Sequence, residues 1–434
     1  RGTNGSAPGA LGSAVKVTAY AYGADDGSTE REAVSLGCDH FFDISSLPPH
    51  QAAAQISADG VHVLVDYDGL HSFNSVGLLA WHPATIQATW LGFAGSSGLG
   101  KRRRRNAIMT SSDKAPHHSH HVVEPARVEP ARVVDVALVD AVVVPPEEAA
   151  GYSESLVYLP YSYQPQDEFM ADVADGKANT HIGTPINFPG KMTSDEVADR
   201  RKSLGLPENA VVFACLTRVN KIDPEGFQDW MEILQRVPSS VLWLLSSDES
   251  IKSSLLSEAQ AYGVHPTRLV MAPRVSRAEH LKRLQLVDLF LDTRHYGQHT
   301  LAADAFWSAT PLLTRPAASF ASRVGASLLS CTFRQSNGCR STKPSPEHML
   351  IAPDRRTFVD TAVRLGSSGS GTQGADSGSL LGFIREDLAK QRGLFVFNST
   401  RSAGNLERTY AALWEYKQSK IPESHIFHAE SCVF

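Results

Sequence analysis

The chain has 434 residues, of which 42% are hydrophobic, and this is enough apolar material for two cores of ordinary domain size. Its formal net charge of −5 argues against a basic field of the kind that binds nucleic acid or membrane surfaces non-specifically. No apolar run reaches membrane-spanning length, no apolar secretory leader is present, and the five cysteines form no close pair. We therefore expect a protein of a reducing intracellular compartment, and because the sequence begins at Arg1 we expect a fragment.

The first part of the chain alternates strand-like and helix-like segments. The run "AVKVTAYAYG" predicts a strand, "REAVSLGCDHFFDIS" (residues 31–45) a helix and "VHVLVDYDG" a second strand, the order typical of a parallel sheet covered by helices. The pattern breaks at "KRRRR" and resumes with "VVDVALVD", so we expect residues 99–132 to be a disordered insertion. The first lobe then comprises residues 1–98 and 133–192.

A second α/β series follows a stretch rich in Gly and Pro, and Thr193 or Ser194 can cap its first helix. The apolar pattern predicts strands over 210–216, 239–245, 268–273, 287–292 and 310–314, and helices over 224–236, 250–262, 277–284 and 301–308. Such regular alternation favours a doubly wound sheet that binds ligands at the carboxyl ends of its strands. We expect this lobe to occupy residues 193–365, followed by a flexible loop over 366–379 and C-terminal helices over 380–434.

The segment "QHTLAAD" follows one of these strands and leads into a helix expected to start near Thr300. The unpaired N–H groups of that first turn, with the Thr300 hydroxyl, could bind a diphosphate. Asp304 lies one helical turn further on, where its carboxylate could accept hydrogen bonds from ribose hydroxyls. The simpler alternative is that Thr300 only caps the helix and that His299 is a surface loop residue.

Two further loops carry cationic residues where strands end. Lys221 in "RVNKIDP" could neutralise a leaving phosphate, although an exposed lysine is most often merely solvated. Arg277 and His280 in "VSRAEHLKR" are candidates for contacts to a base and a phosphate. Three such loops at one rim favour a nucleotide site more strongly than any one of them alone.

Other motifs are less informative. The cluster "HHSHH" could bind a transition metal, but histidine tracts within such insertions are more often compositional, and we predict no metal site. The run "KRRRR" is either a nuclear-localisation or anionic-partner patch or a solvated charge run. No nucleophile elbow, P-loop or GxGxxG occurs where hydrolase, kinase or dehydrogenase chemistry would need it.

Nine sequence blocks in order resemble the catalytic region of the O-linked N-acetylglucosamine transferase and SPINDLY glycosyltransferase family. Among them are "HPATIQATWLGFAGSSG", "LPENAVVFACLTRVNKIDP", "RVPSSVLWLL", "HTLAAD" and "LERTYAALWEY". The resemblance implies a GT-B fold, with two Rossmann-like lobes and a sugar nucleotide between them. It also implies inverting transfer of N-acetylglucosamine from UDP-GlcNAc to Ser or Thr hydroxyls of cytoplasmic and nuclear proteins, without metal or cofactor. Upstream tetratricopeptide repeats would bind the acceptor proteins.

The resemblance also implies roles for individual residues. In the second lobe it assigns Lys221 to the departing phosphate, His280 to stacking on uracil, Arg277 and Arg218 to further nucleotide contacts, His299 and Thr300 to sugar and phosphate, and Asp304 to the ribose. In the first lobe, Leu91 and Gly92 match the backbone that lines the sugar pocket.

The chain departs from the family pattern at several positions. Leu301 stands where the transferases have a second threonine, and a lost hydroxyl contact to a charged phosphate costs about ten- to a hundredfold in affinity. Arg218 replaces a glutamine, His82 replaces an arginine, and two proposed catalytic positions carry Ala54 and Ser57, so no base is assigned. Two alternatives therefore stay open: a protein O-fucosyltransferase using GDP-fucose, and a catalytically weakened homologue that acts as a scaffold.

Overall fold

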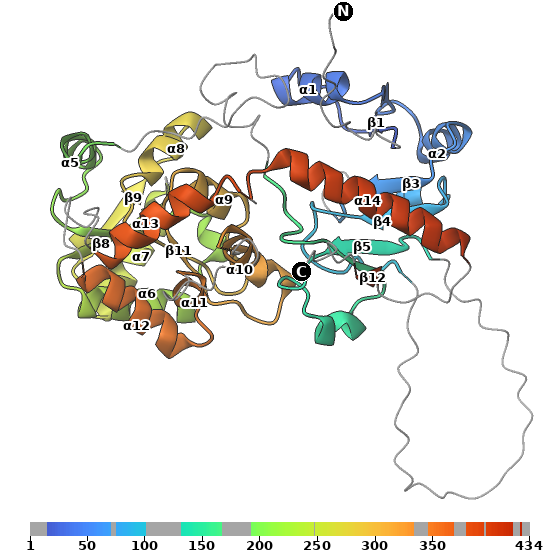
Figure 1. Ribbon diagram of the computed structural model, residues 1–434. Helices are drawn as coiled ribbons and strands as arrows, with labels where there is room; N and C mark the ends of the chain where they lie inside the picture. Colours follow the sequence, from blue (N-terminus) through green and yellow to red (C-terminus); the bar gives the residue numbers. More distant parts are fainter. Residues whose placement is uncertain are drawn as a thin grey trace, which may run out of the picture.

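The structure is a computed structural model that describes residues 15–70, 75–100, 132–166, 192–246, 248–333, 346–368, 379–394, 396–419 and 426–427. Two five-stranded parallel sheets, each flanked by helices, form two lobes side by side, and a separate two-stranded sheet lies beside the first lobe (Figure 1). Most of the expected insertion (101–131) and most of the expected flexible loop (369–378) lie outside the described residues.

The sheet of the first lobe has the strand order β12-β6-β5-β4-β3. Its strands are β3 (Val63–Asp66), β4 (Ile86–Thr89), β5 (Val136–Val139), β6 (Ser155–Tyr158) and β12 (Ile426–Phe427), with α3 (Val76–Leu79) and η1 (Pro146–Gly151) in the connections. All the residues of β4 and β5 are buried, as expected for central parallel strands covered on both faces.

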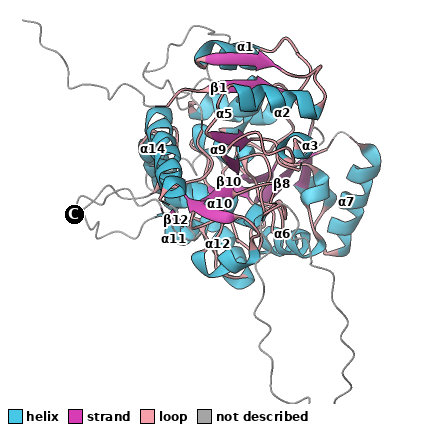
Figure 2. Ribbon diagram, turned by 90° about the vertical axis from the view of Figure 1, so that its right-hand side faces the viewer, coloured by secondary structure: helices cyan, strands magenta, loops and turns pink. Residues whose placement is uncertain are grey.

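The N-terminal segment forms a small unit of its own. It consists of β1 (Thr18–Ala21), α1 (Thr29–Gly37), β2 (His40–Asp43) and α2 (Pro49–Ala58). Figure 2 shows this small sheet, with α1 and α2 beside it, apart from the other strands. The predicted helix over residues 31–45 is wrong in its second half, because α1 ends at Gly37 and β2 follows. Glycine weakens a helix, and the aromatic pair in "HFFD" favours an extended strand.

The sheet of the second lobe has the strand order β11-β10-β7-β8-β9. The chain adds β8 and β9 on one side of β7 and then β10 and β11 on the other, so the strand order reverses between β7 and β10. Its strands are β7 (Val211–Cys215), β8 (Ser240–Leu245), β9 (Leu269–Ala272), β10 (Leu289–Leu291) and β11 (Leu312–Leu313). In open α/β sheets, ligands bind at such a reversal, beyond the carboxyl ends of the strands.

The helices of the second lobe lie in the connections between its strands and after them. They are α5 (Ser194–Ser203), α6 (Pro224–Arg236), α7 (Glu249–Ala261), α8 (Arg277–Leu284), α9 (Thr300–Trp307), α10 (Phe320–Thr332), α11 (Pro346–Leu350), α12 (Arg355–Ser367) and α13 (Leu380–Gln391), with η2 (Val219–Lys221) and η3 (Pro266–Arg268) in loops. Every strand and helix predicted for this lobe is confirmed, and Thr193 caps α5 in a capping box with Glu196.

The C-terminal helices connect the lobes, because α13 lies on the second lobe and α14 (Ser399–Gln418) runs along the first (Figure 1). The Trp414 ring of α14 lies 4.3 Å from the His62 ring, measured between centroids. A direct junction is formed by Tyr163, which follows β6 and packs edge-on against Phe320 of α10 at 4.8 Å. Beside it, the buried Asp140 carboxylate accepts hydrogen bonds from the Tyr163 N–H and, across the junction, from the Ser327 hydroxyl, each at 2.7 Å.

Candidate active site

The loop between β10 and α9 is anchored by the buried carboxylate of Asp292. Its Oδ1 accepts hydrogen bonds from the N–H groups of Thr293 and Gln298, both at 2.8 Å. Its Oδ2 accepts one from the Thr314 hydroxyl at 2.7 Å. Burial raises the pKa of Asp292 to about 6, against these hydrogen bonds, which lower it. Asp292 thus fixes both ends of the loop that leads into α9.

Helix α9 begins at Thr300, as the sequence predicts, and no side chain among the described residues caps it. The first intrahelical bonds run from the N–H groups of Ala302 and Ala303 to the carbonyl of His299, at 3.1 and 3.2 Å. Thr300 itself is exposed. The start of α9 therefore presents N–H groups, the positive end of the helix dipole and a hydroxyl to an anion.

Lys221 lies at the end of η2, after β7, and therefore on the opposite side of the strand-order reversal from α9. Its Nζ donates a hydrogen bond to the Gly297 carbonyl at 3.2 Å and lies 4.0 Å from the centre of the Tyr296 ring. Burial lowers the pKa of Lys221, while the nearby Asp292 charge raises it; the charge of the exposed Arg218 adds to the lowering. Because an ammonium carries three N–H donors, Lys221 can still bind phosphate oxygens.

His299 is held as a neutral ring at the start of α9. Its Nε2 lies 2.9 Å from the Ala321 carbonyl, which can only accept, so Nε2 carries the proton. Burial lowers the pKa of His299 to about 4, and the ring is therefore uncharged at neutral pH. It stacks on the Tyr296 ring with a centroid distance of 4.8 Å and an interplanar angle of 18°.

Arg277, His280 and Asp304 come together from α8 and α9, as the sequence predicts. An Arg277 guanidinium nitrogen lies 2.8 Å from Oδ1 of Asp304, and His280 Nε2 lies 3.7 Å from its Oδ2. Burial raises the pKa of Asp304 to about 6, against the opposing Arg277 charge, and burial lowers that of His280 to about 3. Arg283 donates to His280 Nδ1 at 3.1 Å, which leaves Nε2 without a hydrogen-bond partner among the described residues. The group therefore combines a neutral ring with a carboxylate.

The first lobe reaches this region through the loop after β4, which contains Leu91 and Gly92. Leu91 has a φ of 75°, and a Cβ at Gly92 would lie 1.9 Å from the Tyr67 carbonyl oxygen, so only glycine fits there. The neighbouring Trp90 donates from Nε1 to the Tyr163 carbonyl at 2.8 Å. Tyr163 in turn packs on Phe320, next to Ala321, whose carbonyl contacts the β10–α9 loop. The two lobes thus meet beside the candidate site.

The structure shows where the residues lie that differ from the family pattern. Leu301 is half-buried in the first turn of α9, directly after Thr300. Ala54 and Ser57 lie one helical turn apart on the exposed side of α2. His82 has a φ of 49° and its Nε2 contacts the Arg132 carbonyl.

The sequence did not indicate Asp292, Tyr296 or Gln298 as parts of the site. Asp292 could have been found, because a carboxylate directly after a buried strand points to the ligand edge of a parallel sheet. Gln298 is buried, and its Nε2 donates to the Leu291 carbonyl and to Cys215 Sγ. Nothing in the sequence distinguishes Tyr296 from an ordinary surface tyrosine.

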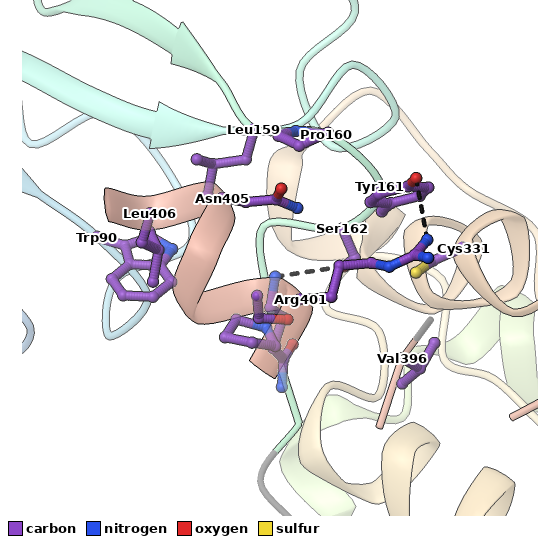
Figure 3. A pocket seen from close by; sticks show the side chains of 13 residues that line it. Trp90, Leu159, Pro160, Tyr161, Ser162, Cys331, Val396, Arg401, Asn405 and Leu406 are labelled. Carbon is purple, nitrogen blue, oxygen red and sulfur yellow. Dashed lines mark hydrogen bonds between the residues drawn. The ribbon is translucent and has the colours of Figure 1, made fainter. Parts of the chain in front are cut away.

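Figure 3 shows a pocket at the junction of the lobes. It is lined by Trp90, Leu159 to Ser162, Gln164, Pro165, Cys331, Val396 and four residues of α14. Arg401 of α14 donates a hydrogen bond to the Tyr161 hydroxyl at 3.1 Å. None of the predicted donor-binding residues lines this pocket, so it contributes to the lobe junction rather than to the candidate site.

Within the described ranges, no group of three or more His, Cys, Asp and Glu side chains could hold a metal ion. No described helix is both long enough and apolar enough to cross a membrane. The motifs "KRRRR" (101–105) and "HHSHH" (117–121) lie outside the described residues.

The fold and the candidate site define a two-lobed α/β protein in which cationic, acidic and aromatic side chains gather at the strand-order reversal of the second lobe. The chain belongs to glycosyl transferase family 41, whose model matches residues 5–121 and 167–374. This confirms the resemblance seen in the sequence.

Individual relatives agree with this assignment. The probable UDP-N-acetylglucosamine–peptide N-acetylglucosaminyltransferase SEC of Arabidopsis thaliana is 28% identical over 411 residues, covering 95% of this chain and 35% of the relative. The Caenorhabditis elegans UDP-N-acetylglucosamine–peptide N-acetylglucosaminyltransferase is 26% identical over 472 residues, covering 95% of this chain and 39% of its own. The chain thus spans little more than a third of the length of these relatives.

A solved structure of a mutant O-GlcNAc transferase from Thermobaculum terrenum superposes with a TM-score of 0.69 at 21% identity, covering 94% of this chain and 63% of that one. At this identity the match speaks for the fold alone. It confirms the predicted GT-B arrangement of two Rossmann-like lobes.

Proposed function

We propose that this chain is the catalytic region of an inverting glycosyltransferase that moves N-acetylglucosamine from UDP-GlcNAc to Ser or Thr hydroxyls of proteins. One observation carries the proposal: three groups suited to the parts of a sugar nucleotide surround the β7–β10 reversal. They are the Lys221 ammonium, the start of α9 with His299, and the Arg277–His280–Asp304 group. Family membership and the relatives' names support this donor and this class of acceptor.

The chemistry assigned to Lys221 follows from where charge develops. In inverting transfer, the oxygen of the acceptor hydroxyl forms a bond to the anomeric carbon as the bond to the β-phosphate oxygen breaks. The hydroxyl proton is released, and the departing UDP takes the electron pair of the broken bond and with it negative charge. The Lys221 ammonium and the N–H groups of α9 lie where they can stabilise that charge. Thr300 adds a hydroxyl donor to the same phosphate.

The Arg277–His280–Asp304 group would bind the nucleoside. His280 is neutral and offers a flat ring to uracil, and Asp304 offers a carboxylate to the ribose hydroxyls. In the structure the Arg277 guanidinium donates a hydrogen bond to Asp304 Oδ1. A ribose hydroxyl that binds this oxygen must therefore share it with Arg277 or displace Arg277 from it. Arg218 is an exposed cation beside Lys221 and would extend the nucleotide contacts.

The first lobe would line the sugar pocket with the backbone of Leu91 and Gly92, because that loop joins the junction beside the β10–α9 loop. Lys221 and α9 provide positive charge that a divalent cation provides in metal-dependent transferases, and the proposal therefore includes no metal and no cofactor. We also propose that the protein acts in the cytoplasm and nucleus, and that tetratricopeptide repeats upstream hold its acceptor proteins.

The test is isothermal titration of the protein with UDP and with GDP, with Lys221→Ala and His280→Ala as site variants and circular dichroism to verify folding. Preferential binding of UDP that both substitutions weaken supports the proposal, and transfer from UDP-GlcNAc to Ser/Thr peptides then tests the reaction. Preference for GDP would instead indicate fucosyl transfer.

A weakened homologue is the second candidate, because Leu301 offers no hydroxyl in the first turn of α9 and Ala54 and Ser57 offer no base on α2. Tight UDP binding without detectable transfer, in the full-length protein, is the result that would favour this scaffold role. Turnover by the full-length protein would rule it out.

A further inference from the structure

The geometry of inverting transfer decides which lobe must hold a base for the acceptor. The acceptor oxygen bonds to the anomeric carbon on the side opposite to the departing phosphate, and this is how the configuration inverts. The groups assigned to that phosphate, Lys221 and the start of α9, belong to the second lobe. A side chain that takes the proton of the acceptor hydroxyl is therefore expected from the first lobe.

The carboxyl ends of the first-lobe strands form the edge that meets the second lobe. Asp140, which follows β5, accepts a hydrogen bond from Ser327 of α10. In the neighbouring parallel pair, Asp66 at the end of β3 lies opposite Thr89 at the end of β4. The loop after β3, which contains Asp68, therefore leaves the sheet at this same edge.

Asp68 packs against the loop of Leu91 and Gly92, whose backbone the proposed function assigns to the sugar pocket. A Cβ at Gly92 would lie 3.0 Å from the Cα of Asp68. The Tyr22 side chain, which follows β1, hydrogen-bonds to the Asp68 carboxylate. Burial and the nearby Asp68 charge raise the pKa of Tyr22, so its phenol stays protonated and donates. Asp68 is thus a held carboxylate beside the expected position of the sugar.

Asp68 differs from the other carboxylates that follow β3 and β5. Asp66 accepts hydrogen bonds from the N–H groups of Asp68 and Gly69, at 3.2 and 3.1 Å, one on each of its oxygens. Asp140 is buried and bonded across the junction of the lobes. Asp68 is only half-buried, next to the exposed Tyr67, and its hydrogen bond with a phenol leaves a carboxylate oxygen that can accept a proton.

We propose that Asp68 is the catalytic base of the transfer reaction. Its carboxylate takes the proton of the Ser or Thr hydroxyl as a lone pair of the hydroxyl oxygen forms the bond to the anomeric carbon. The electron pair of the broken bond leaves with UDP, and the protonated Asp68 afterwards releases its proton to water. The inference rests on the proposed function, and it supplies the base that Ala54 and Ser57 cannot provide.

A purely structural role of Asp68 makes a different prediction. If Asp68 only holds its loop through the hydrogen bond with Tyr22, then Tyr22→Phe must impair transfer as much as Asp68→Asn does. If Asp68 takes the proton, Asp68→Asn removes the base, although its amide oxygen can still accept a hydrogen bond from Tyr22. Tyr22→Phe then retains the base and most of the activity.

The experiment measures kcat for transfer from UDP-GlcNAc to a Ser/Thr peptide in the wild-type protein, Asp68→Asn and Tyr22→Phe. Titration calorimetry with UDP is run on the same proteins, and thermal unfolding followed by circular dichroism verifies that each is folded. The matched control is Glu148→Gln, which neutralises an exposed carboxylate of η1 in the same lobe.

We expect Asp68→Asn to lower kcat about a hundredfold without a change in UDP affinity, because UDP is bound by the second lobe. Tyr22→Phe should lose far less, and Glu148→Gln should match the wild type. Wild-type rates in Asp68→Asn, or an equal loss in Tyr22→Phe, would overturn the inference and leave the proposed function intact. Absence of transfer by the wild-type protein would instead remove the proposed function, and this inference with it.

Discussion

The two lobes contribute to the candidate site in different chemical terms. The second lobe provides all the charged and aromatic side chains assigned to the donor, including Lys221, His280 and Asp304. The first lobe provides a tight backbone loop, in which Gly92 packs against the Tyr67 carbonyl and leaves no room for a side chain. On the proposed function, we expect nucleotide affinity to reside in the second lobe, and we expect the first lobe to shape the space for the sugar and the acceptor.

The second lobe and the small N-terminal sheet differ in how fully their strands are buried. Every residue of β7 is buried, whereas those of β1 are half-buried and β2 is largely exposed. A parallel sheet is stable when helices cover both of its faces, and the two-stranded sheet lacks the burial that the second lobe achieves. A rigid second lobe suits a site whose charges must be held in fixed positions.

Substitution of Lys221 should have the largest effect of any change that tests the division of roles between the two lobes. Replacing Lys221 by Ala removes the ammonium that we assign to the departing phosphate, and we expect transfer to fall about a hundred- to a thousandfold. The control is Lys282→Ala, which removes an exposed lysine of α8. Initial rates with UDP-GlcNAc and a Ser/Thr peptide measure both variants, and equal rates for Lys221→Ala and Lys282→Ala would contradict the assignment.

Leu301 offers a gain-of-function test in the same lobe. Leu301→Thr places a second hydroxyl in the first turn of α9, beside Thr300, where it can donate to a phosphate oxygen. A hydrogen bond to a charged group contributes about 1.5 to 3 kcal/mol, so UDP should bind about ten- to a hundredfold more tightly. Leu301→Val has the same shape as the threonine variant without its hydroxyl, and calorimetry should show no such gain for it.

A first-lobe substitution should separate transfer from nucleotide binding. The Cβ of Gly92→Ala would meet the Tyr67 carbonyl oxygen, and we expect the loop to shift at a cost of about 1 to 3 kcal/mol in the free energy of unfolding. Gly95→Ala is the control, because its Cβ would first meet the Phe93 ring at 3.4 Å. Transfer should fall in Gly92→Ala while UDP affinity stays close to wild type; a matching loss of UDP affinity would show that the lobes do not divide these tasks.

The pH dependence of donor binding should report on Asp304. Burial raises the pKa of Asp304 to about 6. Only the ionised carboxylate forms the ion pair with Arg277 and accepts hydrogen bonds on both oxygens. The affinity for the donor should therefore fall by up to about tenfold per pH unit below pH 6. His280 and His299, with pKa values of about 3 and 4, stay neutral across this range. UDP-GlcNAc is the better ligand for the titration, because the terminal phosphate of UDP itself titrates near pH 6.

The matched variant is Asp304→Asn, which cannot titrate. Its affinity for UDP-GlcNAc should be lower than wild type at pH 8 and nearly constant between pH 5 and 8. A wild-type slope that persists in Asp304→Asn would assign the titration to another group, of which Asp292 is the nearest in pKa.

Much of the second lobe could be predicted because its signals are local. Helix α6 spans the residues that the apolar period predicts, and in the structure Asp223 caps it and Pro224 is its first residue. Helix α9 likewise starts at Thr300 after a buried strand. Alternation of such elements predicts a doubly wound sheet, and a doubly wound sheet directs polar loop residues to one edge. The first lobe was harder, because α1 and β2 follow each other closely and are divided only by weak local signals, the glycine that ends α1 and the aromatic pair in β2.

The sequence alone determined the α/β class, the order of elements in the second lobe and the identity of the cationic and acidic residues at its strand ends. These properties follow from periodicity, capping residues and side-chain chemistry, all of which are local. Only the tertiary structure decided that Asp292 anchors the β10–α9 loop, that Arg277 pairs with Asp304, and that Tyr296 lies between Lys221 and His299. The contacts of Lys221 with Tyr296 and of Arg277 with Asp304 join segments that strand order brings together, and the contacts within the loop depend on the conformation that the folded loop adopts.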